Sequence, residues 1–103
     1  MKKDPIISEQ VKLILKIIQE LSPGRSVELR ITPYGVIQCV AGVNHRRGTP
    51  PNTVEMSWQT LIKLIKKPTL WGSLCESGQI QASGTLSDLS AIFEVAVVRY
   101  SNK

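Results

Sequence analysis

The sequence has few of the residues from which enzymes build catalytic and metal centres. Its 103 residues include one histidine and two cysteines. With no CxxC pair and only isolated acidic residues beside that histidine, no set of metal ligands can be recognised. A glycine-rich phosphate loop is also missing, because the spacing around Gly84-Thr85 is wrong for one. The sequence therefore predicts a protein that is not an enzyme and that uses no metal or other cofactor.

Long apolar runs and aromatic residues are scarce as well. No stretch approaches the ~18 to 20 apolar residues that span a bilayer, and polar residues interrupt the segment from Ile6 onward, so we expect no signal peptide. We therefore expect a cytoplasmic protein in which Cys39 and Cys75 are buried thiols. The net charge of +5 permits contact with anions. Aromatic residues make up only 5%, however, and both tryptophans have core spacing, which argues against a nucleic-acid surface.

The sequence does have the composition of one ordinary globular domain. Apolar residues make up 42% and charged residues 20%. A chain of this length usually has a single hydrophobic core, so we expect residues 1–103 to form one domain.

Residues 5–21 have the pattern of an amphipathic helix. Asp4 can cap it, and Pro5 suits its first position. Apolar residues recur along one face, and others widen that face on both sides. The face consists of Ile7, Val11, Ile14, Ile18 and Leu21, flanked by Leu13, Leu15 and Ile17. This arc is wider than the ~100° needed to lie on one surface, so the helix should also contact a second helix, a ligand or another subunit.

Three segments predict strands in the next part of the chain. Residues 27–31 alternate between apolar and polar side chains, which is typical of a half-buried strand. Residues 32–35 predict a turn into residues 36–41, so these two strands should form a hairpin. Residues 36–41 are more apolar than residues 27–31, and we expect them to be the more central strand. Residues 53–56 predict a third strand.

The second half of the chain predicts short helices around one more strand. Ser57 can cap a helix from Trp58 to about Lys66, with Trp58, Leu61, Ile62 and Ile65 as its buried face. Pro68 breaks this helix, residues 70–76 predict another, and residues 79–82 predict a strand. The β-branched residues at 91–100 leave the last segment open between helix and strand. This order is typical of an α+β domain, with helices on one face of a mostly antiparallel sheet.

Residues 44–55 form a loop with an unusual concentration of cationic and rigid residues. His45, Arg46 and Arg47 are followed by Gly48 and a Pro50-Pro51 pair, which excludes a helix interior or a central strand. Such loops on a rigid scaffold often hold binding groups. His45 could act as a general base, but no nucleophile can be placed beside it from the sequence.

Several of these segments resemble the sterol carrier protein family, most closely its small bacterial members. The resemblance covers about two thirds of the chain, from Pro23 to Ser90. It is found in Pro-Gly-Arg-Ser-Val-Glu at 23 to 28, Pro-Tyr-Gly-Val-Ile-Gln-Cys-Val-Ala-Gly at 33 to 42, His45, Arg-Gly-Thr-Pro-Pro-Asn-Thr-Val-Glu at 47 to 55, the Trp58 helix and Ser-Gly-Gln-Ile-Gln-Ala-Ser-Gly-Thr-Leu-Ser-Asp-Leu-Ser at 77 to 90. The resemblance implies a curved sheet of four to five strands with helices on one face. It also implies an apolar tunnel for lipids or acyl chains between these layers, and no catalytic residues.

Two uses of the apolar interior remain open. In the first, the protein binds a lipid or another hydrophobic molecule with an anionic head. The apolar lining would be Leu61, Ile65, Trp71, Leu74, Leu89, Ile92 and Phe93, with His45, Arg46 and Arg47 at the mouth. The forked donors of the two arginines suit a carboxylate or a phosphate. Equally, the lining residues could be ordinary core, and Arg47 could pair with Glu55. In the second, the domain binds another protein or self-associates through helix 5–21, without a transported ligand.

An open tunnel would be costly for so short a chain. Ligand pockets occupy roughly 300 Å³ or more, and empty interior volume costs on the order of 24 cal/mol per Å³. The total of about 7 kcal/mol approaches the ~5–15 kcal/mol stability of a whole small domain. Either a ligand is always bound, or the pocket is shallow, or the layers close on each other.

Overall fold

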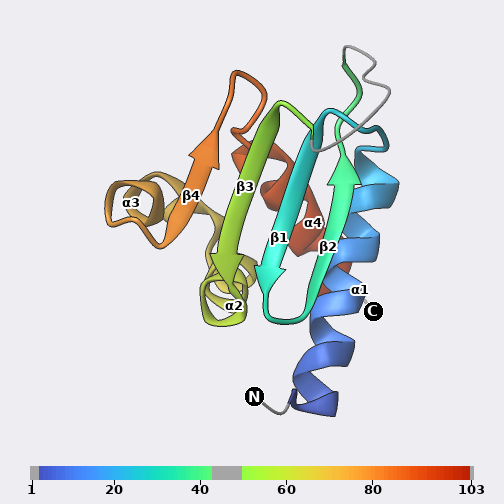
Figure 1. Ribbon diagram of the computed structural model, residues 1–103. Coiled ribbons are helices and arrows are strands. Elements are labelled where there is room, and N and C mark those ends of the chain that lie inside the picture. Colours follow the sequence, from blue (N-terminus) through green and yellow to red (C-terminus); the bar gives the residue numbers. More distant parts are fainter. Residues whose placement is uncertain (1–2, 43–49, 103) are drawn as a thin grey trace.

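The computed structural model describes residues 3–42 and 50–102, and these form four strands with helices behind them (Figure 1). In chain order the elements are α1 (Pro5–Leu21), β1 (Val27–Thr32), β2 (Gly35–Cys39), β3 (Asn52–Ser57), α2 (Trp58–Lys66), the 3-10 helix η1 (Pro68–Leu70), α3 (Trp71–Glu76), β4 (Ile80–Ser83) and α4 (Ser90–Ser101). These elements confirm the predicted α+β class. They also show that the last apolar segment is a helix.

The strands form a mixed sheet in the order β2-β1-β3-β4. β1 and β2 form the predicted antiparallel hairpin, and β3 pairs antiparallel with β4, whereas β1 and β3 run parallel. The prediction of a mostly antiparallel sheet therefore holds except for this one pair. The parallel pair arises because β2 brings the chain back to the start of β1, and β3 begins at that same end of the sheet.

β2 lies at an edge of the sheet, so the prediction that residues 36–41 form a more central strand is wrong. Its apolar side chains do not imply burial on both faces. Cys39 is fully buried, whereas Val36 is 58% exposed on the same face as its register partner Arg30. The central position belongs to β1, whose alternation places Val27, Leu29 and Ile31 in the core.

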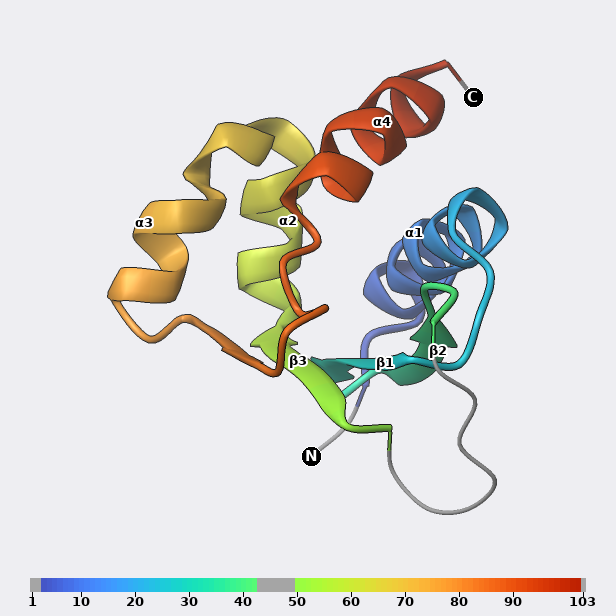
Figure 2. The same ribbon diagram turned by 90° about the horizontal axis from the view of Figure 1, so that it is seen from above.

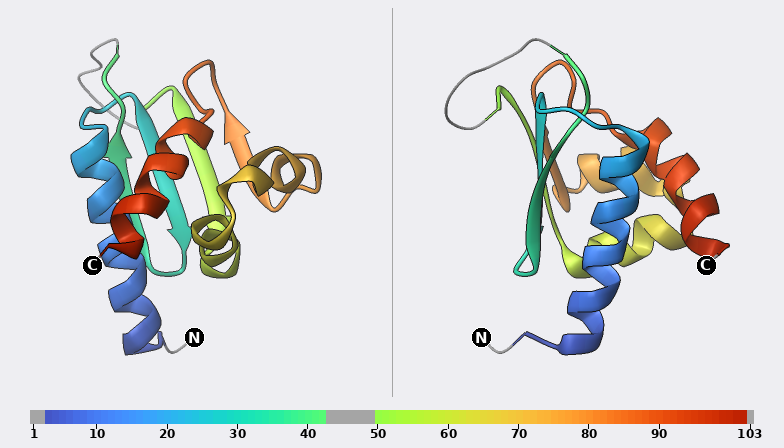
Figure 3. Two further views of the ribbon diagram at one scale, coloured as in Figure 1. Left: turned by 180° about the vertical axis from the view of Figure 1, so that it is seen from behind. Right: turned by 90° about the vertical axis from the view of Figure 1, so that its right-hand side faces the viewer.

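The helices lie on one side of the sheet in two successive positions. α1 packs on β2, and α2 packs on β1 and β3. α4 lies farther from the sheet and packs on α1, α2 and η1 (Figures 2 and 3). The core therefore has an outer cover, α4, which rests on the two helices that flank the interior.

α1 begins and ends as the sequence predicts. The Asp4 side chain accepts hydrogen bonds from the backbone N–H groups of Ile6 and Ile7, at 2.8 and 3.3 Å. Five apolar residues of the helix are buried: Val11, Ile14, Leu15, Ile17 and Ile18. α1 contacts β2 on one side and α2 and α4 on the other, so most of its wide apolar arc is used within the chain.

The buried face of α2 differs from the predicted one. Ser57 caps the helix through the Thr60 N–H, as expected, but Trp58 and Ile62 are only partly buried. Thr60 and Leu64 are buried instead, together with Leu61 and Ile65. At the start of the helix, the Trp58 ring packs edge-on against the buried Tyr34 near the β1–β2 turn and so lies at the margin of the core.

The side of the sheet opposite the helices is polar. No described helix covers it (Figures 2 and 3). Arg30 lies there between two carboxylates: its Nε pairs with Glu28 at 2.5 Å, and one terminal nitrogen lies 3.7 Å from Glu55. These bonds raise the pKa of Arg30, so the guanidinium stays charged at any ordinary pH. Arg30 is thus a described partner of Glu55, whereas the predicted partner Arg47 lies outside the described residues.

Candidate functional site

The seven predicted lining residues converge from α2, α3 and α4 on one interior. Leu61 and Ile65 come from α2, Trp71 and Leu74 from α3, and the remaining three from α4 and the residue before it. Six of them are buried, namely Leu61, Ile65, Trp71, Leu74, Leu89 and Phe93. Ile92 is partly buried and packs against the same core. The sequence pattern therefore identified side chains that meet, although their role in binding a ligand stays a prediction.

Phe93 occupies the centre of this interior. Its side chain is fully buried, and its ring lies 5.8 Å from that of Trp71, centroid to centroid, at an interplanar angle of 34°. Leu89 and Ala96 are also fully buried on the same element or at its start. Because α4 packs on both α1 and α2, these side chains fill the interior between the two helices from the side away from the sheet.

Burial of six of the seven predicted side chains leaves little open space at this interior. Four surface cavities lined by described residues contain none of the seven. This burial favours the alternative in which the layers close on each other. A ligand chain would have to take the place of side chains that now fill the space.

The predicted polar residues at the mouth, His45, Arg46 and Arg47, lie outside the described residues. The described residues on either side of them connect to β2 and β3. Gly42 follows β2, and the buried Pro50 leads through Pro51 into β3. Gly42 and Pro50 lie at the same end of the sheet, the end at which β1 and β3 begin (Figure 1).

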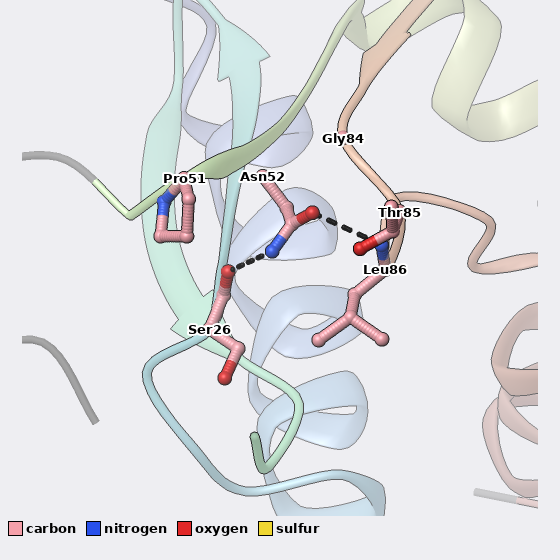
Figure 4. Close-up of a pocket in the computed structure, with 6 residues that line it drawn as sticks. All are labelled: Ser26, Pro51, Asn52, Gly84, Thr85 and Leu86. Carbon is pink, nitrogen blue, oxygen red and sulfur yellow. Dashed lines mark hydrogen bonds between the residues drawn. The ribbon is translucent and has the colours of Figure 1, made fainter. Parts of the chain in front are cut away.

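A surface pocket of about 330 Å³ lies at this end of the sheet (Figure 4). It is lined by Ser26, Pro51, Asn52, Gly84, Thr85 and Leu86. Asn52 holds its walls together: Nδ2 donates to the Ser26 carbonyl oxygen at 2.8 Å, and Oδ1 accepts from the Leu86 N–H at 3.0 Å. With 5% exposure, this amide links the starts of β1 and β3 to the loop between β4 and α4.

Glycine is required at one position of this pocket because of Asn52. Gly84 has a φ of +105°, a conformation that L side chains rarely adopt, and a Cβ there would lie 2.2 Å from Asn52 Oδ1. The close approach lets the β4–α4 loop pass directly over the amide. Sequence reasoning missed this tie, because nothing marks Asn52 except its place after two prolines.

The ionisable groups of the described chain show no perturbed catalytic pair. Burial raises the pKa of the Cys39 thiol to about 11. Burial, and to a lesser extent the Asp88 charge, raises the pKa of Cys75, which is only partly buried, contrary to prediction. Hydrogen bonds from Ser90 lower the pKa of Asp88. Within residues 3–42 and 50–102, no three histidine, cysteine or acidic side chains are grouped to hold a metal ion.

Hydropathy along the described helices gives no candidate for a membrane-crossing segment.

Comparison with known proteins identifies both the family and the fold. The family model described as "Bacterial SCP ortholog" matches residues 5–95. A solved structure called "UbiJ-SCP2 Ubiquinone synthesis protein" is similar to this chain with a TM-score of 0.50 and 13% sequence identity. The match covers 93% of this chain and 95% of that one. At this identity the likeness shows a shared fold only. No curated protein matches the sequence.

Proposed function

Because the chain belongs to the family of bacterial sterol carrier protein orthologues, we propose that it binds a lipid or another hydrophobic molecule with an anionic head, without catalysing a reaction. The observation that carries this proposal is the position of α4. This helix closes the apolar interior from outside by resting on α1 and α2. It is therefore a cover that a ligand chain displaces, rather than a layer on which the sheet depends.

The two faces of α4 support such a displacement. Phe93 and Ala96 are buried, yet Val95 and Val98 on other faces are 53% and 60% exposed. A helix at the surface of a globular protein usually has one polar face, and a helix that is apolar all round is usually buried. Water therefore does not favour the present position of α4 as strongly as it would for an amphipathic helix. The displaced helix can pack on a bound chain with the same residues.

The free energies involved are comparable. Exposing a buried Phe or Leu side chain costs about 1.5–3 kcal/mol, so releasing Leu89 and Phe93 costs about 3–6 kcal/mol. Each buried CH₂ group of a ligand contributes about 0.8 kcal/mol. Roughly four to eight buried methylene groups would thus offset the loss. A long fatty acid supplies this number with fewer than half of its carbons, whereas a medium-chain fatty acid needs most of its carbons. This estimate favours long acyl chains as ligands.

The anionic head follows from charge. The chain has a net charge of +5, and Arg46 and Arg47 stand beside His45 in the segment that joins Gly42 to Pro50. Guanidinium groups bind carboxylates and phosphates through paired hydrogen bonds. Replacing both arginines by glutamine should weaken the binding of a fatty acid and should not weaken that of the matching fatty alcohol.

Contact quenching by a brominated fatty acid tests the location of the ligand. Trp71 lies against Phe93, whereas Trp58 lies against Tyr34 at the other end of α2. Trp58→Phe leaves Trp71 as the only tryptophan, and Trp71→Phe leaves Trp58. Bromostearate should quench Trp71 strongly and Trp58 weakly, and unbrominated stearate should raise the melting temperature of both variants. Equal quenching, or no melting shift at saturating stearate, would remove the proposal.

A second candidate function is protein interaction or self-association without a transported ligand. The exposed Val95 and Val98 favour it, because apolar side chains on one helix suit a partner surface. The predicted use of helix 5–21 for self-association has less surface available, since most of the arc of α1 is buried within the chain. Sedimentation velocity at low micromolar concentration tests this function. A dimer that dissociates in a Val95→Ser, Val98→Ser variant would favour it.

A further inference from the structure

The outer face of α4 is apolar, and no described segment covers it. Ala91, Val95 and Val98 lie four and three residues apart, so they form one stripe along the helix, and all three are exposed. Val95 is 53% exposed and Val98 is 60% exposed. In Figures 2 and 3 this helix is the layer farthest from the sheet. Neighbouring exposed apolar side chains mark surfaces that bind a protein or a membrane.

Two lysines flank this stripe at the end of α2. α4 packs on both α2 and η1, so the joint between those two elements lies beside it, and this joint holds Lys66 and Lys67. Both lysines are exposed, and neither ammonium group has an ion pair within the described chain. Figure 2 shows α2 running away from the sheet, so that its end reaches the layer of α4. The α4 surface thus consists of the apolar stripe and these two lysines.

The composition of the α4 surface favours a membrane over a protein partner. Protein interfaces are enriched in aromatic side chains and depleted in lysine, and the α4 surface has two lysines and no aromatic residue. Lysine side chains suit the border between water and acyl chains, because an aliphatic stem carries their charge. The negative potential of an anionic bilayer attracts them. Of the two charged residues of α4 itself, Arg99 is already paired with Glu20 at 3.6 Å, and only Glu94 opposes this attraction.

We propose that the α4 surface docks on a bilayer that contains anionic lipids. Val95 and Val98 enter the boundary between head groups and acyl chains, where interfacial helices bury their apolar face. Lys66 and Lys67 contact the negative head groups beside them. Docking brings α4, the proposed cover of the apolar interior, against the lipids. Exchange of lipid at this point rests on the proposed function, whereas docking itself does not.

Vesicle binding tests the proposal. The protein should bind vesicles made of equal amounts of phosphatidylcholine and phosphatidylglycerol more strongly than vesicles of phosphatidylcholine alone, and salt should weaken this binding. Lys66→Gln, Lys67→Gln should weaken it about 25-fold, which is about fivefold for each lysine. Val95→Ser, Val98→Ser should weaken it about tenfold, because two half-exposed valines bury about as much surface as one whole side chain. Glu94→Gln should strengthen it.

Matched variants elsewhere on the protein provide the controls. Val36 is 58% exposed on the side of the sheet away from the helices, and Lys12 and Lys16 are exposed on α1. Val36→Ser should therefore weaken binding much less than the change of both valines of α4. Lys12→Gln, Lys16→Gln removes the same charge as the change at the end of α2 and should also weaken binding much less. Equal losses in either matched pair would overturn the proposal.

Two other results would overturn it as well. One is equal binding to neutral and anionic vesicles, and the other is a dimer that forms through Val95 and Val98. The vesicles contain no free fatty acid, so a failure of stearate to quench Trp71 would leave docking intact and remove only the lipid site. Stearate that quenches Trp71 in a protein that binds no vesicles would refute docking alone.

Discussion

Replacement of Asn52 by alanine should destabilise the domain more than any exposed substitution, because one buried amide joins three segments. Its two hydrogen bonds measure 2.8 Å to the Ser26 carbonyl and 3.0 Å from the Leu86 N–H, and the residue is 5% exposed. Asn52→Ala leaves both groups without their partner, in one bond that is buried and one that is partly buried. A buried group that loses its partner costs about 1–3 kcal/mol, so the two together should cost about 2–6 kcal/mol.

The effect is large relative to the stability of the whole domain, which is ~5–15 kcal/mol for a chain of this size. At roughly 4–8 °C per kcal/mol, the melting temperature should fall by at least about 8 °C. Urea unfolding followed by tryptophan fluorescence measures the change directly, because Trp58 and Trp71 belong to the same fold. Asn102 is exposed at the end of α4, and Asn102→Ala should change the free energy of unfolding by less than ~0.5 kcal/mol.

Asn52→Asp separates the two bonds. Its carboxylate still accepts from the Leu86 N–H but faces the Ser26 carbonyl oxygen with no proton to donate. Protonation restores a donor, so the deficit of this variant relative to wild type should shrink as the pH falls below the pKa of the new carboxyl group. An Asn52→Ala protein that unfolds within ~1 kcal/mol of wild type would refute the role of the amide as a tie.

Three further predictions concern the glycines, the thiols and the start of α4. Gly84→Ala should cost more than Gly78→Ala in urea unfolding, because both glycines have positive φ, of +105° and +81°, but only the first would bring a Cβ against Asn52. Iodoacetamide at mildly alkaline pH should alkylate the partly buried Cys75 before Cys39, whose pKa burial raises to about 11; peptide mapping that finds Cys39 modified first would contradict its burial. Asp88→Ala should destabilise the protein by about 0.5–1 kcal/mol at neutral pH. Since the folded pKa of Asp88 is lowered, its contribution is present above the unfolded pKa and is lost as the pH falls through the folded pKa; a deficit that persists at low pH would contradict this.

The helices and strands of this fold could be predicted from the sequence because each has a local signal. Asp4 and Pro5 mark the start of α1, and Ser57 marks that of α2, since caps act within one turn. The alternation of β1 likewise depends only on which face each residue occupies. Residues 91–100 could not be assigned in this way, because β-branched residues suit a strand locally while packing on α1 and α2 decides for a helix.

The strand order and the pocket at the start of β3 could not be predicted, because both depend on contacts between distant segments. The apolar composition of β2 suggested a central strand, but Val36 is exposed and Cys39 is buried at the edge of the sheet. The role of Asn52 depends on Ser26 and Leu86, which reach it only after the sheet has formed. In contrast, six of the seven predicted lining residues are buried together, because helical spacing indicates most core-facing side chains, although it misplaced Trp58 and Ile62.

The central claim is that α4 is a displaceable cover over an apolar binding site, and the distance between α4 and α1 tests it most directly. Spin labels at Lys12 and Val98, both exposed, report that distance by electron resonance in a Cys75→Ser background. Labels at Lys12 and Gln81 report the sheet as a control. Saturating oleate should lengthen the Lys12–Val98 distance and leave the Lys12–Gln81 distance unchanged. Oleate that binds without changing the first distance, or that does not bind, would contradict the claim.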